Sequence, residues 1–211
     1  MEKVIPNLAE NSTGDESINS TNDKIKEING FVLLSSLDMD IVIDLKYATT
    51  DNFTKKIIYP NNLCTLRRNT AEKLARANAE LKKLGYRIKV WDAYRPVYVQ
   101  QLFWDLLKDS HFVANPKNGG SIHNKGCAVD VTLVNKDDNE LIMPSKFDDF
   151  SSNAYRNNPN MTNEAKKNLD LLTKCMVDNG FVPLETEWWH FVDVDSKNYD
   201  IADINLNLFL E

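Results

Sequence analysis

The period of the apolar residues changes abruptly at Gly85, and this change constrains the fold more than any other feature of the sequence. Upstream, four apolar residues recur at the spacing of one helix face: Leu74, Ala77, Leu81 and Leu84. They predict a helix over residues 70–84, which Gly85 favours ending. Asn69, with Glu72 three residues later, resembles a capping box at its start. Downstream, Tyr86, Ile88 and Val90 alternate with Arg87, Lys89 and Trp91, which predicts a strand.

Two further helices follow from the same kind of pattern. Pro96 can open a second helix, which carries Leu102, Phe103, Leu106 and Leu107. A third is predicted over residues 162–179, before Gly180, with a stripe of Ala165, Leu169, Leu172 and Met176. Strand-like stretches lie within residues 39–54, 121–134 and 188–194. Because helices and strands intersperse without regular βαβ spacing, we predict an α+β fold in a single domain, with a mainly antiparallel sheet flanked by helices.

A polar N-terminal stretch precedes this pattern. Residues 1–28 are rich in Asn, Ser, Thr, Asp and Glu and carry few large apolar side chains, so we predict a disordered tail there. Residues 29–211 form the predicted domain. The chain has 211 residues, of which 42% are hydrophobic and 27% charged, and this balance is sufficient for one apolar core.

Composition argues against several functions and locations. The formal net charge is -6 and the basic residues are dispersed, whereas nucleic-acid binding needs clustered Lys and Arg. No apolar run reaches the roughly 18 residues of a membrane span, and no basic-then-apolar leader is visible. We therefore expect a cytoplasmic protein, with an exported, processed form as the alternative. The cysteines are sparse and far apart, so we expect buried thiols rather than disulfides or a cysteine metal site: Cys64, Cys127 and Cys175.

Two of the three histidines have neighbours that could complete a metal site. His123 is followed by Asp130 in SIHNKGCAVD, where small residues let the chain turn so that both side chains can face one point. His190 ends the stretch ETEWWH. A catalytic zinc site takes three protein ligands and leaves one position for water, and two imidazoles with one carboxylate meet that need. His111 stands alone, and we expect a structural role for it.

A metal-activated water also needs a base and a positive group nearby. Glu187 is the candidate base. On a regular strand it would face away from His190, three residues on, so we expect it to lie just before that strand. Arg95, at the end of a predicted strand, could stabilise an oxyanion. The residues alone leave structural alternatives open: Glu187 as a rim charge, Arg95 as a partner of Asp92, and Trp188 and Trp189 as core or pocket wall.

Two motifs formed by these residues resemble one family of zinc peptidases. The first is SxHxxGxAxD, with Ser121, His123, Gly126, Ala128 and Asp130, and the second is ExWH, with Glu187, Trp189 and His190. Together they are similar to the family of VanX-type D-alanyl-D-alanine dipeptidases and VanY-type D,D-carboxypeptidases. Three further segments resemble the VanX branch: DLKYATTDNFT (44–54), WDAYRP (91–96) and LIMPSKFDDF (141–150). The resemblance covers roughly residues 30–195.

The resemblance implies a role for each matching residue. It implies one zinc ion per chain in a cleft, with His123, Asp130 and His190 as ligands. Glu187 would be the general base, Arg95 would stabilise the oxyanion, Asp148 would hold the free ammonium group of the substrate, and Ser121 would assist in substrate binding. The sequence departs from the family at Pro144, where the family commonly has glycine; proline fixes one φ angle and removes a hydrogen-bond donor.

Three functional hypotheses follow, the first two from the resemblance. The first is hydrolysis of D-Ala-D-Ala to two D-alanines, serving glycopeptide resistance or recycling of wall-derived dipeptide. The second is a D,D-carboxypeptidase acting on longer peptidoglycan stem peptides, which an open groove in place of a wall at Asp148 would favour. The third is a metal-binding module without turnover, which the presence of both Glu187 and Arg95 disfavours. The expected partner is a small D,D-dipeptide, with no nucleic acid and no membrane span.

Overall fold

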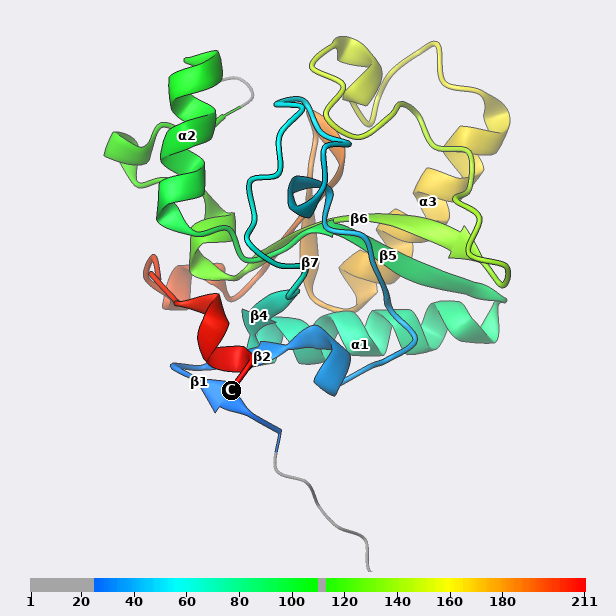
Figure 1. Ribbon diagram of the computed structural model, residues 1–211. Coiled ribbons are helices and arrows are strands. Elements are labelled where there is room, and N and C mark those ends of the chain that lie inside the picture. The colour runs from blue at the N-terminus through cyan, green and yellow to red at the C-terminus, as the bar shows by residue number, and fades with distance from the viewer. Residues whose placement is uncertain (1–24, 110–112) are drawn as a thin grey trace, which may run out of the picture.

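Three α-helices and two β-sheets make up residues 25–109 and 113–211, the part of the chain that the computed structural model describes (Figure 1). Residues 1–24 of the predicted tail lie outside this part, and so does His111. Glu27 and Ile28 are the last two residues of the predicted tail, and they form the first strand. Helices and strands are interspersed without regular βαβ units, and most strand neighbours are antiparallel, which confirms the predicted α+β class.

The larger sheet has five strands, in the order β3 (Val42–Ile43), β5 (Tyr86–Asp92), β6 (Ala128–Asn135), β8 (Glu187–Asp193) and β7 (Phe181–Leu184). β3 runs parallel to β5 and the other neighbours are antiparallel, so the predicted mainly antiparallel sheet is confirmed. β6 lies at its centre and is buried from Ala128 to Val134. A smaller antiparallel sheet joins β1 (Glu27–Ile28), β2 (Phe31–Leu33) and β4 (Thr65–Arg67).

Two helices pack against each other and against the larger sheet. α1 (Arg68–Lys83) contacts β5 and α3 (Asn163–Asp178) contacts β7; α1 runs along the lower side of the sheet in Figure 1. Both ranges match the predictions to within two residues. Gly85 and Gly180 follow the helices with φ of +83° and +88°, a conformation that glycine adopts at little cost. The predicted capping box is wrong: Asn69 donates a hydrogen bond to Asp195 instead of capping α1.

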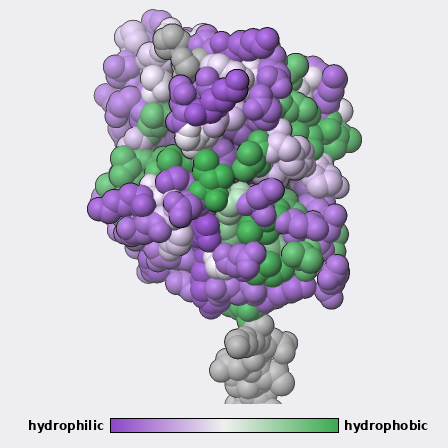
Figure 2. All heavy atoms as spheres, turned by 90° about the vertical axis from the view of Figure 1, so that its left-hand side faces the viewer, coloured by the Kyte–Doolittle hydropathy of each residue, from purple (hydrophilic) through white to green (hydrophobic). Residues whose placement is uncertain are grey.

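α2 (Val97–Leu107) and long loops lie on the opposite side of the sheet from α1 (Figure 1). Phe103 of α2 is buried, but Leu102 and Leu106 are 37% and 54% exposed, so only part of the predicted apolar face enters the core. Seen from the left-hand side of Figure 1, the molecule carries apolar patches between hydrophilic residues (Figure 2). Rings from the loops, α2 and the sheet form an aromatic cluster of Tyr47, Phe53, Trp91, Phe103, Phe147, Trp188 and Trp189.

Short 3-10 helices complete the described chain: η1 (Leu34–Ser36), η2 (Lys46–Ala48), η3 (Pro116–Asn118), η4 (Ile122–Lys125), η5 (Ser152–Ala154), η6 (Ser196–Asn198) and η7 (Leu206–Phe209). The three cysteines are buried and unbridged, as predicted. Within the described residues, none of the helices has both the length and the apolar character that crossing a membrane would require.

Candidate active site

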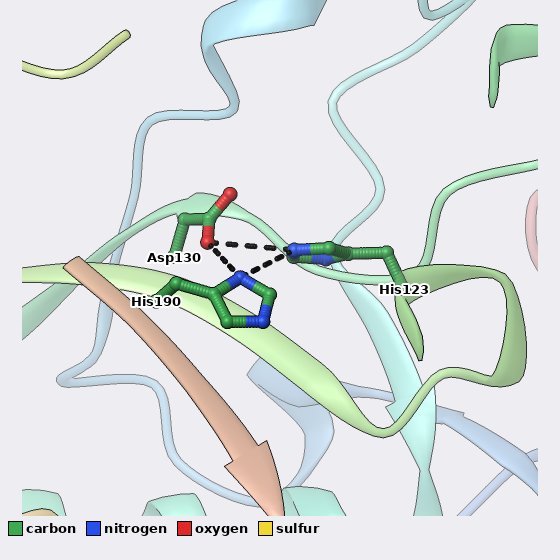
Figure 3. A group of neighbouring side chains, drawn as sticks. All are labelled: His123, Asp130 and His190. Atoms are coloured by element: carbon green, nitrogen blue, oxygen red, sulfur yellow. Dashed lines mark hydrogen bonds and ion pairs between the residues drawn. The ribbon is translucent and has the colours of Figure 1, made fainter. Parts of the chain in front are cut away.

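Three side chains from two strands and one 3-10 helix converge on one point (Figure 3). Asp130 of β6 and His190 of β8 are direct partners in the antiparallel ladder, so their side chains start on the same face of the sheet. His123 reaches them from η4. Asp130 Oδ1 lies 2.9 Å from His190 Nδ1 and 3.4 Å from His123 Nε2, and the two nitrogens are 3.2 Å apart. The three predicted metal ligands therefore form one compact group, called the metal group below.

The chemistry of these atoms favours a cation between them. His123 Nδ1 lies 2.7 Å from the carbonyl oxygen of Ala93, and donation there leaves a lone pair on Nε2 that faces Asp130 and His190. Ligands of a tetrahedral zinc ion at about 2.0–2.1 Å lie roughly 3.3 Å from one another, which is close to the separations in the metal group. Burial raises the pKa of Asp130, but the two imidazoles outweigh burial and hold it well below its usual range. The residues thus fit a metal ion.

The residues around η4 explain how His123 and Asp130 meet. Ser121 caps η4: its Oγ accepts from the backbone N–H of His123, and the Asn124 side chain accepts from the backbone N–H of Ser121. Gly126 ends η4 with φ of +73°. A Cβ at this position would lie 2.3 Å from a ring carbon of Phe31, so the turn requires glycine. The chain then enters β6 with Asp130 directed back toward His123.

Glu187 lies beside the metal group, but by a route that the sequence analysis did not anticipate. It is the first residue of β8, so the expectation that it precedes the strand is wrong. The register between β7 and β8 shifts at Pro183 and Leu184, and such an irregularity breaks the alternation of faces. Glu187 Oε2 consequently lies 3.9 Å from His190 Nδ1. Burial raises the pKa of Glu187 to about 7, and His190 partly opposes this rise.

Asp148 contributes a third carboxyl to the site, after Asp130 and Glu187, and Pro144 lies four residues before it in the same loop. Its backbone has a φ of +56°, a left-handed conformation that Asp tolerates better than most residues. The hydroxyl of Tyr47, 101 residues away in sequence, lies 3.0 and 3.3 Å from its two oxygens and can donate to either. Burial raises the pKa of Asp148 to about 7, and the Tyr47 hydrogen bond opposes the rise.

Arg95 pairs with Asp92 and also faces the site, so the two roles considered from the sequence are compatible. Its Nε and Nη2 donate to Oδ2 of Asp92 at 3.0 and 2.7 Å. Burial alone would lower the pKa of Arg95, but Asp92 together with Tyr47, Tyr59 and Asp130 outweighs burial, and the pKa lies well above its ordinary value. The guanidinium therefore carries its full positive charge in the site.

One cavity of about 400 Å³ contains every site residue that the sequence predicted: Arg95, Ser121, His123, Asp130, Asp148, Glu187 and His190. Tyr47, Phe53 and Trp189 are among its other walls. A larger hollow of about 740 Å³ shares only Phe53 and Asp148 with it and contains none of the metal group. The smaller cavity, which contains the metal group and Glu187, is called the active-site cavity below.

Comparison with known proteins gives this site a family. The family model described as D-ala-D-ala dipeptidase, Peptidase_M15, matches residues 27–207. The chain belongs to this family. A D-alanyl-D-alanine dipeptidase of Escherichia coli (strain K12) is 32% identical over 171 residues, which cover 81% of this chain and 88% of the relative. One of Enterococcus faecalis (strain ATCC 700802 / V583) is 30% identical over 192 residues, covering 82% and 95%. One of Enterococcus faecium is 30% identical over 183 residues, covering 77% and 91%.

In this member of the D-ala-D-ala dipeptidase family, two residues that shape the site were not predicted from the sequence. Tyr47 was assigned to a strand-like stretch, but it lies in η2 and contacts Asp148. Its place within the segment 44–54, which carries part of the family resemblance, was the available signal. Asn124 stands at a variable motif position, yet its amide donates to the carbonyl oxygen of Arg95 at 2.7 Å. This contact joins η4 to the segment that follows β5. No local pattern marks that contact.

Proposed function

We propose that this chain hydrolyses D-Ala-D-Ala to two D-alanines and uses one zinc ion per chain. The metal group, the candidate base Glu187 and the carboxyl of Asp148 line one cavity. The substrate is inferred by analogy with relatives named D-alanyl-D-alanine dipeptidase. The observation that carries the proposal is Glu187 Oε2 at 3.9 Å from His190 Nδ1. A module that only binds metal has no need of a base at that position, so turnover is favoured over mere binding.

His123, Asp130 and His190 would hold the zinc ion, since two imidazoles and one carboxylate with an open position are a typical catalytic set. When bound, zinc supplies Lewis acidity, which polarises a carbonyl group and makes water acidic near neutral pH. The Ala93 carbonyl would keep His123 in the tautomer whose Nε2 can bind.

Glu187 would accept the proton of the attacking water and later pass it to the leaving amine. A general base works best when its pKa is close to the operating pH, and burial brings the pKa of Glu187 to about 7. Its carboxylate lies next to His190 without belonging to the compact metal group, so it would remain free to move a proton.

Three other residues would position the substrate. Arg95 would stabilise the negative oxygen that develops on the scissile carbonyl, because its charge is fixed and it lines the same cavity. Asp148 would pair with the free ammonium group of the dipeptide, and Ser121 would assist in substrate binding.

The wall at Asp148 favours a dipeptide over a longer stem peptide. Tyr47 holds Asp148 at 3.0 Å, and both residues border the active-site cavity. In a longer peptide, a neutral amide replaces the ammonium group and the chain must continue past this wall. A desolvated carboxylate facing that amide lacks its countercharge, which disfavours the longer substrate. We therefore place D,D-carboxypeptidase activity second.

Release of D-alanine by the purified protein, stripped of metal and reloaded with zinc, tests the proposal. D-Ala-D-Ala and an acetylated peptide ending in D-Ala-D-Ala are compared in an assay coupled to D-amino-acid oxidation. We expect turnover of D-Ala-D-Ala and a much lower rate on the acetylated peptide. Glu187→Gln should lower kcat by about 10²- to 10⁴-fold while zinc content stays unchanged. Absence of D-alanine release, or full activity of Glu187→Gln, would contradict the proposal.

Such an activity would deplete the dipeptide used for cell-wall precursors. It could therefore serve glycopeptide resistance or the recycling of wall-derived dipeptide, and a cytoplasmic location is part of this proposal. Growth of producing cells with and without a glycopeptide distinguishes the two roles, because only the first predicts a change in sensitivity.

A further inference from the structure

Gln100 on α2 joins the guanidinium of Arg95 to the wall of the active-site cavity. Its side-chain amide is enclosed, and the residue is 1% exposed. Oε1 accepts a hydrogen bond from Arg95 Nη1 at 2.8 Å. Nε2 donates to the carbonyl oxygen of Ala114 at 2.7 Å, and Ala114 lines the active-site cavity. The buried amide of Gln100 thus connects the Arg95 side chain to the cavity wall at Ala114, which is 14 residues from Gln100 in the sequence.

Asp92 alone does not fix the orientation of Arg95. Both hydrogen bonds from Arg95 to Asp92, from Nε and Nη2, end on the same oxygen, Oδ2. Two bonds that meet at one acceptor leave the guanidinium able to pivot about that oxygen within its plane. Phe103 lies 5.0 Å from Cζ of Arg95 and limits movement out of the plane, but not rotation within it. A second point of attachment is needed, and Gln100 supplies it on Nη1.

The donors of Arg95 can be counted. A guanidinium has five N–H groups in a rigid fork. Among the described residues, Asp92 accepts from two of them and Gln100 from a third, and the Tyr59 side chain also interacts with the guanidinium. At least one N–H remains for a ligand in the active-site cavity, which Arg95 lines. Preorganised donors of this kind stabilise a developing negative charge without having to reorient during the reaction.

We propose that Gln100 is a positioning residue, which holds Arg95 for the oxyanion and ties this orientation to the cavity wall at Ala114. The inference rests on the role of Arg95 in the proposed function. The amide group is required for both contacts, because it accepts at one end and donates at the other. A glutamate keeps the acceptor for Arg95 but has no donor for Ala114, and a leucine of similar size has neither.

The neighbouring Gln101 supplies a matched control. It has the same side chain on the same helix, but it is exposed and donates to Asp105 rather than to the site. Gln100→Leu, Gln100→Glu and Gln101→Leu are compared with the wild type in kcat, KM and zinc content. We expect Gln100→Leu to lower kcat about 10- to 100-fold, as loss of a positioning partner commonly does, with zinc content unchanged and KM altered less than kcat. Gln101→Leu should match the wild type.

Gln100→Glu separates the two contacts. It should recover most of the kcat lost in Gln100→Leu, because it still accepts from Arg95, and it should raise KM, because the wall at Ala114 loses its donor. A structural role alone predicts instead that both variants lose activity in proportion to their loss of thermal stability. Wild-type kcat in Gln100→Leu, or an equal loss in Gln101→Leu, overturns the proposal.

A second readout does not depend on turnover. Rotation of the Arg95 guanidinium about the Nε–Cζ bond must break the hydrogen bond between Nη1 and Gln100, so its rate reports that contact. It can be followed through the ¹⁵N-labelled side-chain resonances, with Arg95→Lys for assignment. We expect slow rotation in the wild type and in Gln100→Glu, and faster rotation in Gln100→Leu. If the wild type releases no D-alanine but rotation depends on Gln100 as described, the proposed function fails and the positioning contact stands. Rotation at wild-type rate in Gln100→Leu refutes the positioning role itself.

Discussion

The turn at Gly126 offers a sharp test of how the site is built. Replacing Gly126 with alanine adds a Cβ that would lie 2.3 Å and 2.9 Å from two ring carbons of Phe31 and 3.2 Å from the backbone nitrogen of Arg67. Phe31 is fully buried, so its ring cannot move away without disturbing the core. The left-handed φ of +73° adds a second cost for any residue with a side chain.

The expected magnitude follows from these two costs. The left-handed conformation costs roughly 1–2 kcal/mol for a residue other than glycine, and overpacking of a core typically costs about 1–3 kcal/mol. Alanine also stiffens the unfolded chain, which offsets about 0.4–1 kcal/mol. We therefore expect Gly126→Ala to lower the free energy of unfolding by about 1–5 kcal/mol, a large share of the roughly 5–15 kcal/mol of a typical domain.

Gly85→Ala is the matched control, because Gly85 has a φ of +83° but no heavy atom within 4 Å of an added Cβ. It carries the conformational cost and not the collision, so the two variants should differ by about 1–3 kcal/mol. Unfolding in urea measures the loss of free energy of unfolding in each variant. In thermal unfolding, the difference between the two variants should appear as a gap of roughly 2–12 °C in Tm. Equal losses in the two variants would refute the argument that Phe31 makes glycine obligatory between His123 and Asp130.

Three further results are expected. Asp148→Asn should raise KM for D-Ala-D-Ala about 10- to 100-fold by removing a charged partner. KM of the wild type should rise as pH falls through the pKa of Asp148, which bound zinc brings below its metal-free value of about 7, because only the ionised carboxyl binds ammonium. KM of the variant should not rise. Tyr47→Phe removes the hydrogen bond that lowers the pKa of Asp148, so the same rise in KM should begin at higher pH, and an unmoved profile would contradict it. Chelation should lower Tm by roughly 8–16 °C for zinc previously at about 1,000 times its Kd, and His123→Ala should show little of this shift.

The helices were predictable because their information is local. The stripes of α1 and α3 repeat within each helix, and Gly85 and Gly180 end them through the conformational freedom of glycine itself. The capping box failed for the opposite reason. The side chain of Asn69 donates a hydrogen bond to Asp195, which is 126 residues away, and no local sequence pattern predicts that partner. The exposed Leu102 and Leu106 fail similarly, because tertiary packing decides which face of α2 meets the core.

The site was predictable as a set of residues and not as a set of contacts. Residue chemistry and the resemblance to the family together selected residues that line one cavity, and Asp148 and Ser121 came from the resemblance alone. Strict alternation along β8 placed Glu187 incorrectly, because it cannot foresee a register shift imposed by β7. The contact between Tyr47 and Asp148 spans 101 residues and depends on how two loops pack over the sheet.

The balance of charge in the active-site cavity connects these contacts to function. Among the described residues that line it, Arg95 is the permanent cation, and Asp92 already neutralises it. Asp130, Asp148 and Glu187 are left without a permanent countercharge. Burial is the main reason that the pKa values of Asp148 and Glu187 rise to about 7, and the charge of Asp130 adds to both. A dication held by the metal group would offset this excess and lower both values. Metal binding would thereby keep the base and the ammonium-binding carboxylate ionised at neutral pH, which links substrate binding to the metal before any bond is broken.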